Sequence, residues 1–238
     1  MRARGWKTAA GAAAMSGTLL AGLPIAAQGQ AAPRPYPTPA SFAAFLIADQ
    51  AEEIALARTA APASISGNAE ILTLGPDGYR VAVKGGNGFV CLVDRAWSKP
   101  FDDPEFWNPH MRAPECLNAV AASSVLPLTL DRARWAVTGV AKSEIMARTR
   151  AALAGKTLPS PAPGSMVYMM SKQGYISDGA APHWHPHVMF YTPTATAAAW
   201  GENLPGSPVF RADDEATGVT TFFVLTPKWS DGTSAVMP

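Results

Sequence analysis

Three of the four histidines of this chain lie at alternate positions of one short segment. The segment APHWHPHVMFY runs from residue 181 to 191 and contains His183, His185 and His187. In an extended chain, the side chains at positions i and i+2 project to the same side. His185 and His187 are therefore expected to point the same way, with Cα atoms about 6.6 Å apart. Pro186 favours this geometry because it biases the residue before it toward the extended region.

Two imidazoles at that separation can bind one transition-metal ion. Zinc and copper sites use such pairs and take further ligands from neighbouring strands or loops. His183 lies about 13 Å from His187 along an ideal strand, so it reaches the same ion only if the backbone bends. A further ligand from outside the segment is best supplied by His110, the one remaining histidine. Asp178 and Glu115 are weaker candidates. The sequence thus predicts a zinc or copper site drawn from His183, His185, His187 and His110.

The histidine segment also has a simpler interpretation, as the polar face of a strand. Pro186 is typical of an edge strand, where exposed polar side chains are common. Zinc is the first expectation because neutral imidazoles suit it and it needs no redox partner. Copper is the alternative because four methionines fall on or near the neighbouring strands, although methionine commonly fills gaps in a core. These methionines are Met166, Met169, Met170 and Met189.

No motif in the chain identifies a catalytic residue. The sequence lacks the HExxH pattern of zinc proteases and the GxSxG pattern of serine hydrolases. Whether the protein is an enzyme therefore stays open, and its catalytic residues are unknown. If it is an enzyme, a metal-dependent hydrolase that activates a bound water is the first expectation.

The N-terminal residues have the layout of an export signal. Arg2, Arg4 and Lys7 precede an apolar run over residues 9–27, and small residues follow. This order is typical of a secretory signal peptide. We therefore expect a signal peptide over residues 1–31, a proline-rich tether over 32–40, and a single domain over 41–238. The mature protein is expected in the periplasm or outside the cell.

The charge of the mature chain argues against a nucleic-acid partner. The signal carries three basic residues and no acidic one, so its removal changes the formal net charge from +1 to −2. A nearly neutral chain without basic runs lacks the electrostatic character of nucleic-acid binders. No second apolar run is long enough to span a membrane. The expected partner is a small molecule or a metal ion, and the oligomeric state stays open.

Cys91 and Cys116 are the two cysteines of the chain. In an oxidising compartment, an even pair indicates a disulfide. In the alternative, Cys91 in the apolar run GFVCLV is a buried thiol and Cys116 is an unrelated loop residue. If the two are bonded, we expect the bond to join the end of a strand to the irregular segment that follows it.

The first half of the chain predicts a helix followed by strands. Residues 41–58 contain no glycine or proline and favour a helix. Three β-prone runs between residues 69 and 94 are separated by GPDG and KGGN, which indicate a three-stranded antiparallel meander. Residues 95–116 show no periodicity, and such a long irregular connection is usually functional or crosses the surface of a domain.

The second half predicts three helices and three further strands. Asn118 is expected to cap a short helix, and Ser143 a longer one that ends at Gly155. Residues 165–171, 187–193 and 219–226 are β-prone, and a short helix is expected around residues 195–200. Strands and helices do not alternate strictly, which argues against a doubly wound fold. We expect a single-domain α+β fold with an antiparallel or mixed sheet of about six strands and three to four helices.

Three stretches of the chain resemble a known group of sequences. FVCLVDRAW, FWNPHMRAPEC and HWHPHVMFY are similar to stretches in an uncharacterised family of exported bacterial proteins. The resemblance spans most of the mature chain and implies bacterial origin and export. It implies no activity, because none is attached to that family.

Three classes of function are therefore expected. The first is an exported metal-binding protein. The second is a small-molecule binding or sensing domain whose pocket lies under residues 95–116. The third is a structural or interaction module that holds no metal.

Overall fold

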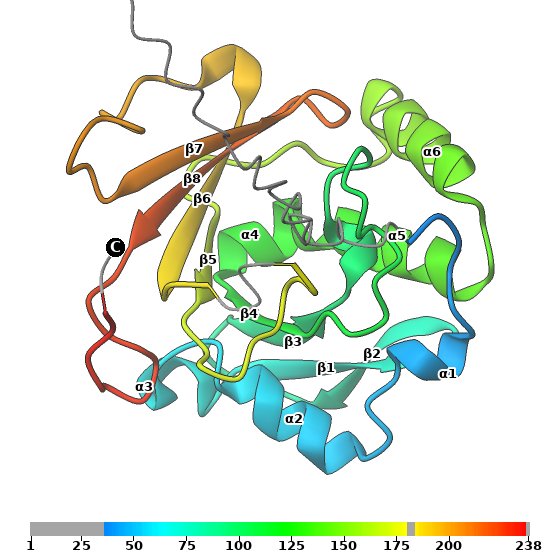
Figure 1. The fold of residues 1–238 in the computed structure, drawn as a ribbon, viewed down its shortest axis with the longest axis horizontal. Coiled ribbons are helices and arrows are strands. Elements are labelled where there is room, and N and C mark those ends of the chain that lie inside the picture. The colour runs from blue at the N-terminus through cyan, green and yellow to red at the C-terminus, as the bar shows by residue number, and fades with distance from the viewer. Residues whose placement is uncertain (1–35, 180–183, 237–238) are drawn as a thin grey trace, which may run out of the picture. The chain divides into compact units, whose positions relative to one another are not determined.

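The computed structural model describes residues 36–179 and 184–236 (Figure 1). The predicted signal peptide and the first residues of the predicted tether lie outside the described residues. Contacts divide the chain into Met1–Ala32 and Pro33–Pro238, and every described residue belongs to the second unit. Within the described ranges, no helix has the length and apolar character needed to cross a membrane.

One mixed sheet organises the described residues, which confirms the predicted α+β class. Its strand order is β2-β1-β3-β4-β5-β6-β8-β7, and only β1 and β3 pair in parallel. The described ranges thus contribute eight strands rather than about six. The strands are β1 (Glu70–Gly75), β2 (Gly78–Val83), β3 (Val90–Asp94), β4 (Ala113–Leu117), β5 (Met166–Met169), β6 (His187–Pro193), β7 (Val209–Asp214) and β8 (Val219–Leu225).

The predicted antiparallel meander over residues 69–94 is wrong at its third strand. The GPDG turn joins β1 and β2 as a hairpin, as expected, but β3 lies on the other side of β1 and runs parallel to it. The connection between β2 and β3 crosses back past the start of β1. A Cβ atom at Gly85 would lie 2.0 Å from the backbone nitrogen of Glu70, so only glycine fits this close approach. The KGGN segment is therefore a crossing point rather than a hairpin turn.

Helices cover both faces of the sheet. Figure 1 shows α2 on one face, and α4 and α5 on the other. The α-helices are α1 (Phe42–Phe45), α2 (Gln50–Arg58), α3 (Ala63–Ser66), α4 (Ala119–Ser124), α5 (Leu126–Val137) and α6 (Lys142–Ala154). Two 3-10 helices, η1 (Ala96–Ser98) and η2 (Thr194–Thr196), complete the described elements. η2 takes the place of the short helix expected around residues 195–200.

Local capping explains where several helices begin. The single helix expected over residues 41–58 is interrupted, because the Asp49 side chain accepts a hydrogen bond from the Ala51 N–H (2.8 Å) and starts α2 there. Asn118 caps α4 as expected, with its side-chain oxygen 2.8 Å from the Ala121 nitrogen. α6 begins at Lys142, so Ser143 lies inside this helix rather than at its cap. α5 has no counterpart among the expected elements.

The predicted disulfide between Cys91 and Cys116 is present. The two residues lie directly opposite each other on β3 and β4, so the bond joins two neighbouring strands rather than a strand and a loop. Both cysteines are fully buried against α2. Because side chains alternate along a strand, Leu92 and Glu115 project to the opposite face, toward α4 and α5.

Removing this disulfide should lower the free energy of unfolding by about 3 kcal/mol, because it closes a loop between cysteines 25 positions apart. Urea denaturation of the oxidised wild type and of the Cys91→Ala, Cys116→Ala double variant measures the difference. A loss below about 1 kcal/mol would contradict the chain-entropy origin of this stabilisation.

Candidate functional site

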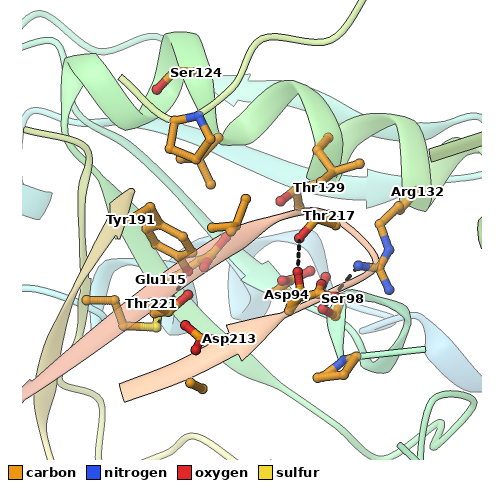
Figure 2. Close-up of a pocket in the computed structure, with 18 of the residues that line it drawn as sticks. Asp94, Ser98, Glu115, Ser124, Thr129, Arg132, Tyr191, Asp213, Thr217 and Thr221 are labelled. Atoms are coloured by element: carbon orange, nitrogen blue, oxygen red, sulfur yellow. Dashed lines mark hydrogen bonds between the residues drawn. The ribbon is translucent and has the colours of Figure 1, made fainter. Parts of the chain in front are cut away.

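A pocket of about 270 Å³ lies between α5 and the C-terminal strands of the sheet (Figure 2). Its walls are mostly apolar and include a small set of polar and charged side chains. The apolar lining comprises Pro100, Val125, Leu128, Leu153, Pro159, Pro161, Met189, Ala212, Val219 and Phe223. The polar and charged lining includes Asp94, Ser98, Glu115, Thr129, Arg132, Tyr191, Asp213, Asp214, Thr217 and Thr221.

The period of the strands explains why these side chains meet. Met189 on β6 pairs with Phe223 on β8, and Tyr191 pairs with Thr221. Positions i and i+2 of a strand share a face, so all four side chains project toward the pocket. Across the cavity, α5 presents residues 128, 129 and 132, whose spacing places them on one side of a helix.

Asp94 and Glu115 form a buried carboxyl pair on the floor of the pocket. Asp94 ends β3, and Glu115 on β4 lies diagonally across from it on the same face. Both residues are only 6% exposed. Asp94 accepts a hydrogen bond from the Arg95 backbone N–H (2.8 Å). The carboxyl group of Glu115 has no hydrogen-bond or ion-pair partner within the part of the chain that the structure describes.

The two carboxyl groups differ in how readily they ionise. Burial raises the pKa of Glu115 well above its usual value, and the charge of Asp94 raises it further. Burial also raises the pKa of Asp94, but the Arg95 N–H and the charge of Arg132 oppose this shift. The pair therefore ionises first at Asp94, and Glu115 keeps its proton to a higher pH than an exposed glutamate does.

Arg132 is a buried cation on the wall of the pocket. Its guanidinium group donates hydrogen bonds to the backbone oxygens of Lys99 (2.6 Å) and Ser98 (3.4 Å). The group also stacks over the Phe101 ring, 4.3 Å from the ring centroid. Burial lowers the pKa of Arg132 to about 10, so it stays charged at neutral pH. The charge of Arg132 acts on Asp94 through space, and Figure 2 shows the hydrogen bond of Arg132 to Ser98.

Tyr191 supplies a hydroxyl group next to Glu115 (Figure 2). Burial raises the pKa of this phenol well above its usual value, and the charges of Glu115 and Asp94 add to the shift. The hydroxyl therefore stays protonated at neutral pH. It donates to the sulfur of Met189 (3.5 Å), which is a weak acceptor, so the phenol can also donate to a better one.

The described members of the predicted metal site lie in different surroundings. His187 opens β6 and is 8% exposed, whereas His185 is exposed. The Nδ1 of His187 lies 2.7 Å from the backbone oxygen of His185, which leaves Nε2 as the ring nitrogen able to bind a metal. Burial lowers the pKa of His187 and favours its neutral form. His183 lies outside the described residues.

His110 takes part in a different cluster. Its Nδ1 lies 3.1 Å from both carboxylate oxygens of Asp178, and its side chain is 63% exposed. Among the described residues, no three His, Cys, Asp or Glu side chains are placed to hold a metal ion. The zinc or copper site therefore stays a prediction.

Zinc titration tests this metal prediction. We expect metal-free wild type to bind zinc, and the His185→Ala, His187→Ala double variant to bind none. Binding should weaken below the histidine pKa region, because protons compete for the same nitrogens. Equal heats for wild type and the double variant in isothermal titration would show that the segment is only a polar strand face.

The irregular segment before β4 is held by two carboxylates. Glu105 accepts hydrogen bonds from Lys99 (3.1 Å), Ser177 (3.0 Å) and Asn108 (3.3 Å). Burial acts to raise the pKa of Glu105, but these donors lower it below its usual value. The Glu105 carboxylate is thus fully engaged in fixing the segment.

Asp178 is the second of these carboxylates. It accepts hydrogen bonds from the hydroxyl groups of Tyr36 and Tyr175 in addition to its contact with His110. Although burial opposes the shift, these donors lower the pKa of Asp178 to about 2. The pocket meets the segment 95–116 only at its two ends, through residues 98, 100 and 115. This segment therefore borders the pocket rather than covering it.

Sequence motifs do not identify three of the pocket residues, Asp94, Arg132 and Tyr191. The sequence suggests Glu115 only as a weak candidate metal ligand. One signal could have located the carboxyl pair. If the cysteines pair directly across two strands, alternation places Leu92, Asp94 and Glu115 together on the opposite face. Arg132 gives no comparable signal, because its position depends on how α5 packs on the sheet.

Comparison with known proteins leaves the pocket as the main guide to function. No protein-family model, curated protein or solved structure matches this chain.

Proposed function

We propose that this protein binds a small, largely apolar molecule in the pocket between α5 and strands β6 and β8. The observation that carries this proposal is the unpartnered carboxyl group of Glu115, which lines a cavity of about 270 Å³. Among the described residues, the Glu115 carboxyl oxygens are not fully enclosed by protein, whereas Arg132 Nε and Ser98 Oγ of the same lining are fully buried without a partner. Leaving such a buried polar group without a partner costs about 1–3 kcal/mol, and a ligand with suitable polar groups offsets that cost.

The size of the cavity sets the scale of the ligand. A dry cavity of about 150 Å³ accommodates benzene. The larger cavity of this protein therefore has room for an aromatic or aliphatic ring with a short substituent. Mostly apolar walls with a few converging polar groups are typical of small-molecule sites.

We also propose that the protein acts outside the cytoplasm. The N-terminal sequence has the order of a secretory signal. The Cys91–Cys116 disulfide supports the same compartment, because structural disulfides persist in oxidising surroundings.

A pocket-filling substitution tests the binding proposal. Thr221 lies on β8 inside the pocket, so the Thr221→Trp ring would occupy the space that a ligand needs. Saturation-transfer NMR with benzyl alcohol as the probe should detect binding to wild type and at least a tenfold weaker signal for Thr221→Trp. Thr196→Trp is the matched control, because Thr196 is exposed on η2 and does not line the pocket. Equal probe binding by wild type and Thr221→Trp would refute the proposal.

A further inference from the structure

The charged residues of the pocket lining are predominantly acidic. Four of them are carboxylic acids and one is an arginine. The positive charge of Arg132 offsets the negative charge of Asp94. Asp213 accepts a hydrogen bond (2.9 Å) from Arg211, which does not line the pocket. The cavity therefore has more carboxyl groups than cations to pair with them.

Of the four carboxylic acids that line the cavity, Glu115 is the one whose side chain accepts no hydrogen bond from a described residue. It is 6% exposed, it lines the cavity, and no described side chain donates a hydrogen bond to it. A ligand must therefore supply the donor. The cavity lining has four carboxylic acids and one arginine, and this excess of acidic groups favours a positively charged donor over a neutral one.

Aromatic rings in the cavity lining favour the same ligand charge. Tyr191 and Phe223 both line the cavity, on neighbouring strands β6 and β8. Ring faces attract cations, and more strongly where water is excluded. Apolar walls around the rings suit the body of an organic ligand better than a bare metal ion.

We infer that the ligand is a small organic cation, a protonated primary amine on an apolar body, whose ammonium group pairs with Glu115. This inference rests on the proposed function and specifies the class of ligand that the pocket takes.

Binding of such a cation should release a proton from the protein. Glu115 keeps its proton to a higher pH than an exposed glutamate does, and an ammonium group pairs only with the ionised carboxylate. The Glu115 O–H bond therefore breaks, its electrons stay on the carboxylate, and the proton leaves to solvent. The charged and titratable groups around Glu115 are Asp94 on β3, Tyr79 on β2, Arg132 on α5, Tyr191 on β6, and Asp213 and Asp214 on β7.

Isothermal titration with benzylamine and benzyl alcohol tests the inference. A buried charge-assisted hydrogen bond is worth about 1.5–3 kcal/mol, so wild type should bind benzylamine about 10- to 100-fold more tightly than benzyl alcohol. The Glu115→Gln variant should lose this preference. Glu144→Gln on α6 is the matched control, because Glu144 is exposed and outside the pocket, and it should behave like wild type.

Proton release gives a second measurement that needs no variant. Titrations of benzylamine into wild type in two buffers of different ionisation enthalpy should show proton release on binding. Equal affinities for the two probes would overturn the cationic ligand and leave the pocket as a binding site. If neither probe binds wild type at millimolar concentration, the proposed function fails as well.

Discussion

Replacing Arg95 with methionine should lower the free energy of unfolding by about 4 kcal/mol. Arg95 is fully buried, and its guanidinium group lies 2.8 Å from the carboxylate of Glu53 on α2. It also donates hydrogen bonds to the backbone oxygens of Phe45 (2.7 Å) and Val93. This side chain therefore ties α1 and α2 to the end of β3. Its removal leaves the Glu53 carboxylate buried without its partner, and an uncompensated buried charge is strongly destabilising.

A double-mutant cycle tests the Arg95–Glu53 contact. Urea denaturation of Arg95→Met, Glu53→Met and the double variant should give a double-variant loss smaller than the sum of the single losses. The exposed pair Arg148–Glu144 has a similar separation of 2.9 Å and serves as the control. Arg148→Met should cost less than about 1 kcal/mol, because water screens an exposed pair. Additive losses at Arg95 and Glu53 would show that the two residues do not act as a pair.

Glu115→Gln should stabilise the ligand-free protein relative to wild type, and increasingly so as the pH rises. The pKa of Glu115 is raised in the folded protein, so the folded state holds a proton that the unfolded state releases above pH 4.5. The stability that Glu115 contributes to wild type is therefore fully present below pH 4.5 and is lost as the pH rises above that value. The slope that Glu115 contributes is at most about 1.4 kcal/mol per pH unit, and glutamine removes it.

Denaturation curves at several pH values between 5 and 8 measure the Glu115 effect. The difference in unfolding free energy between Glu115→Gln and wild type should grow with pH, while Glu144→Gln should give a constant difference. Asp178, whose pKa is lowered to about 2, contributes with the opposite sign: its stabilisation is lost as the pH falls from 3.8 toward 2. The pH range in which Asp178 titrates therefore lies below the range of pH 5 to 8 used for this measurement. A pH-independent difference for Glu115→Gln would show that Glu115 is ionised throughout.

The elements that the sequence predicts correctly are those with strong local signals. β5, β6 and β8 coincide with runs rich in β-branched and aromatic residues, and Asn118 marks the start of α4. α5 is missed because Pro127 interrupts its pattern, although proline is tolerated in the first turn of a helix. The parallel pairing of β3 with β1 depends on the close approach at Gly85, which is a tertiary contact that local sequence does not encode.

The candidate site depends even more on long-range pairing. Asp94 and Glu115 become neighbours only when β3 and β4 pair, and Arg132 reaches them only through the packing of α5. If Cys91 and Cys116 lie directly opposite each other on paired strands, that register also places Asp94 and Glu115 on the same face. The histidine segment gives the stronger compositional signal, but its two described members differ in burial, and its third lies outside the described residues.

A crystal structure of the protein with benzylamine bound tests most directly whether the pocket is a ligand-binding site. We expect the aromatic ring of the probe between α5 and β8, with its nitrogen about 2.9 Å from a carboxylate oxygen of Glu115. A structure at saturating benzylamine in which the pocket holds no probe, while density for the probe lies elsewhere on the molecule, would contradict the proposed function.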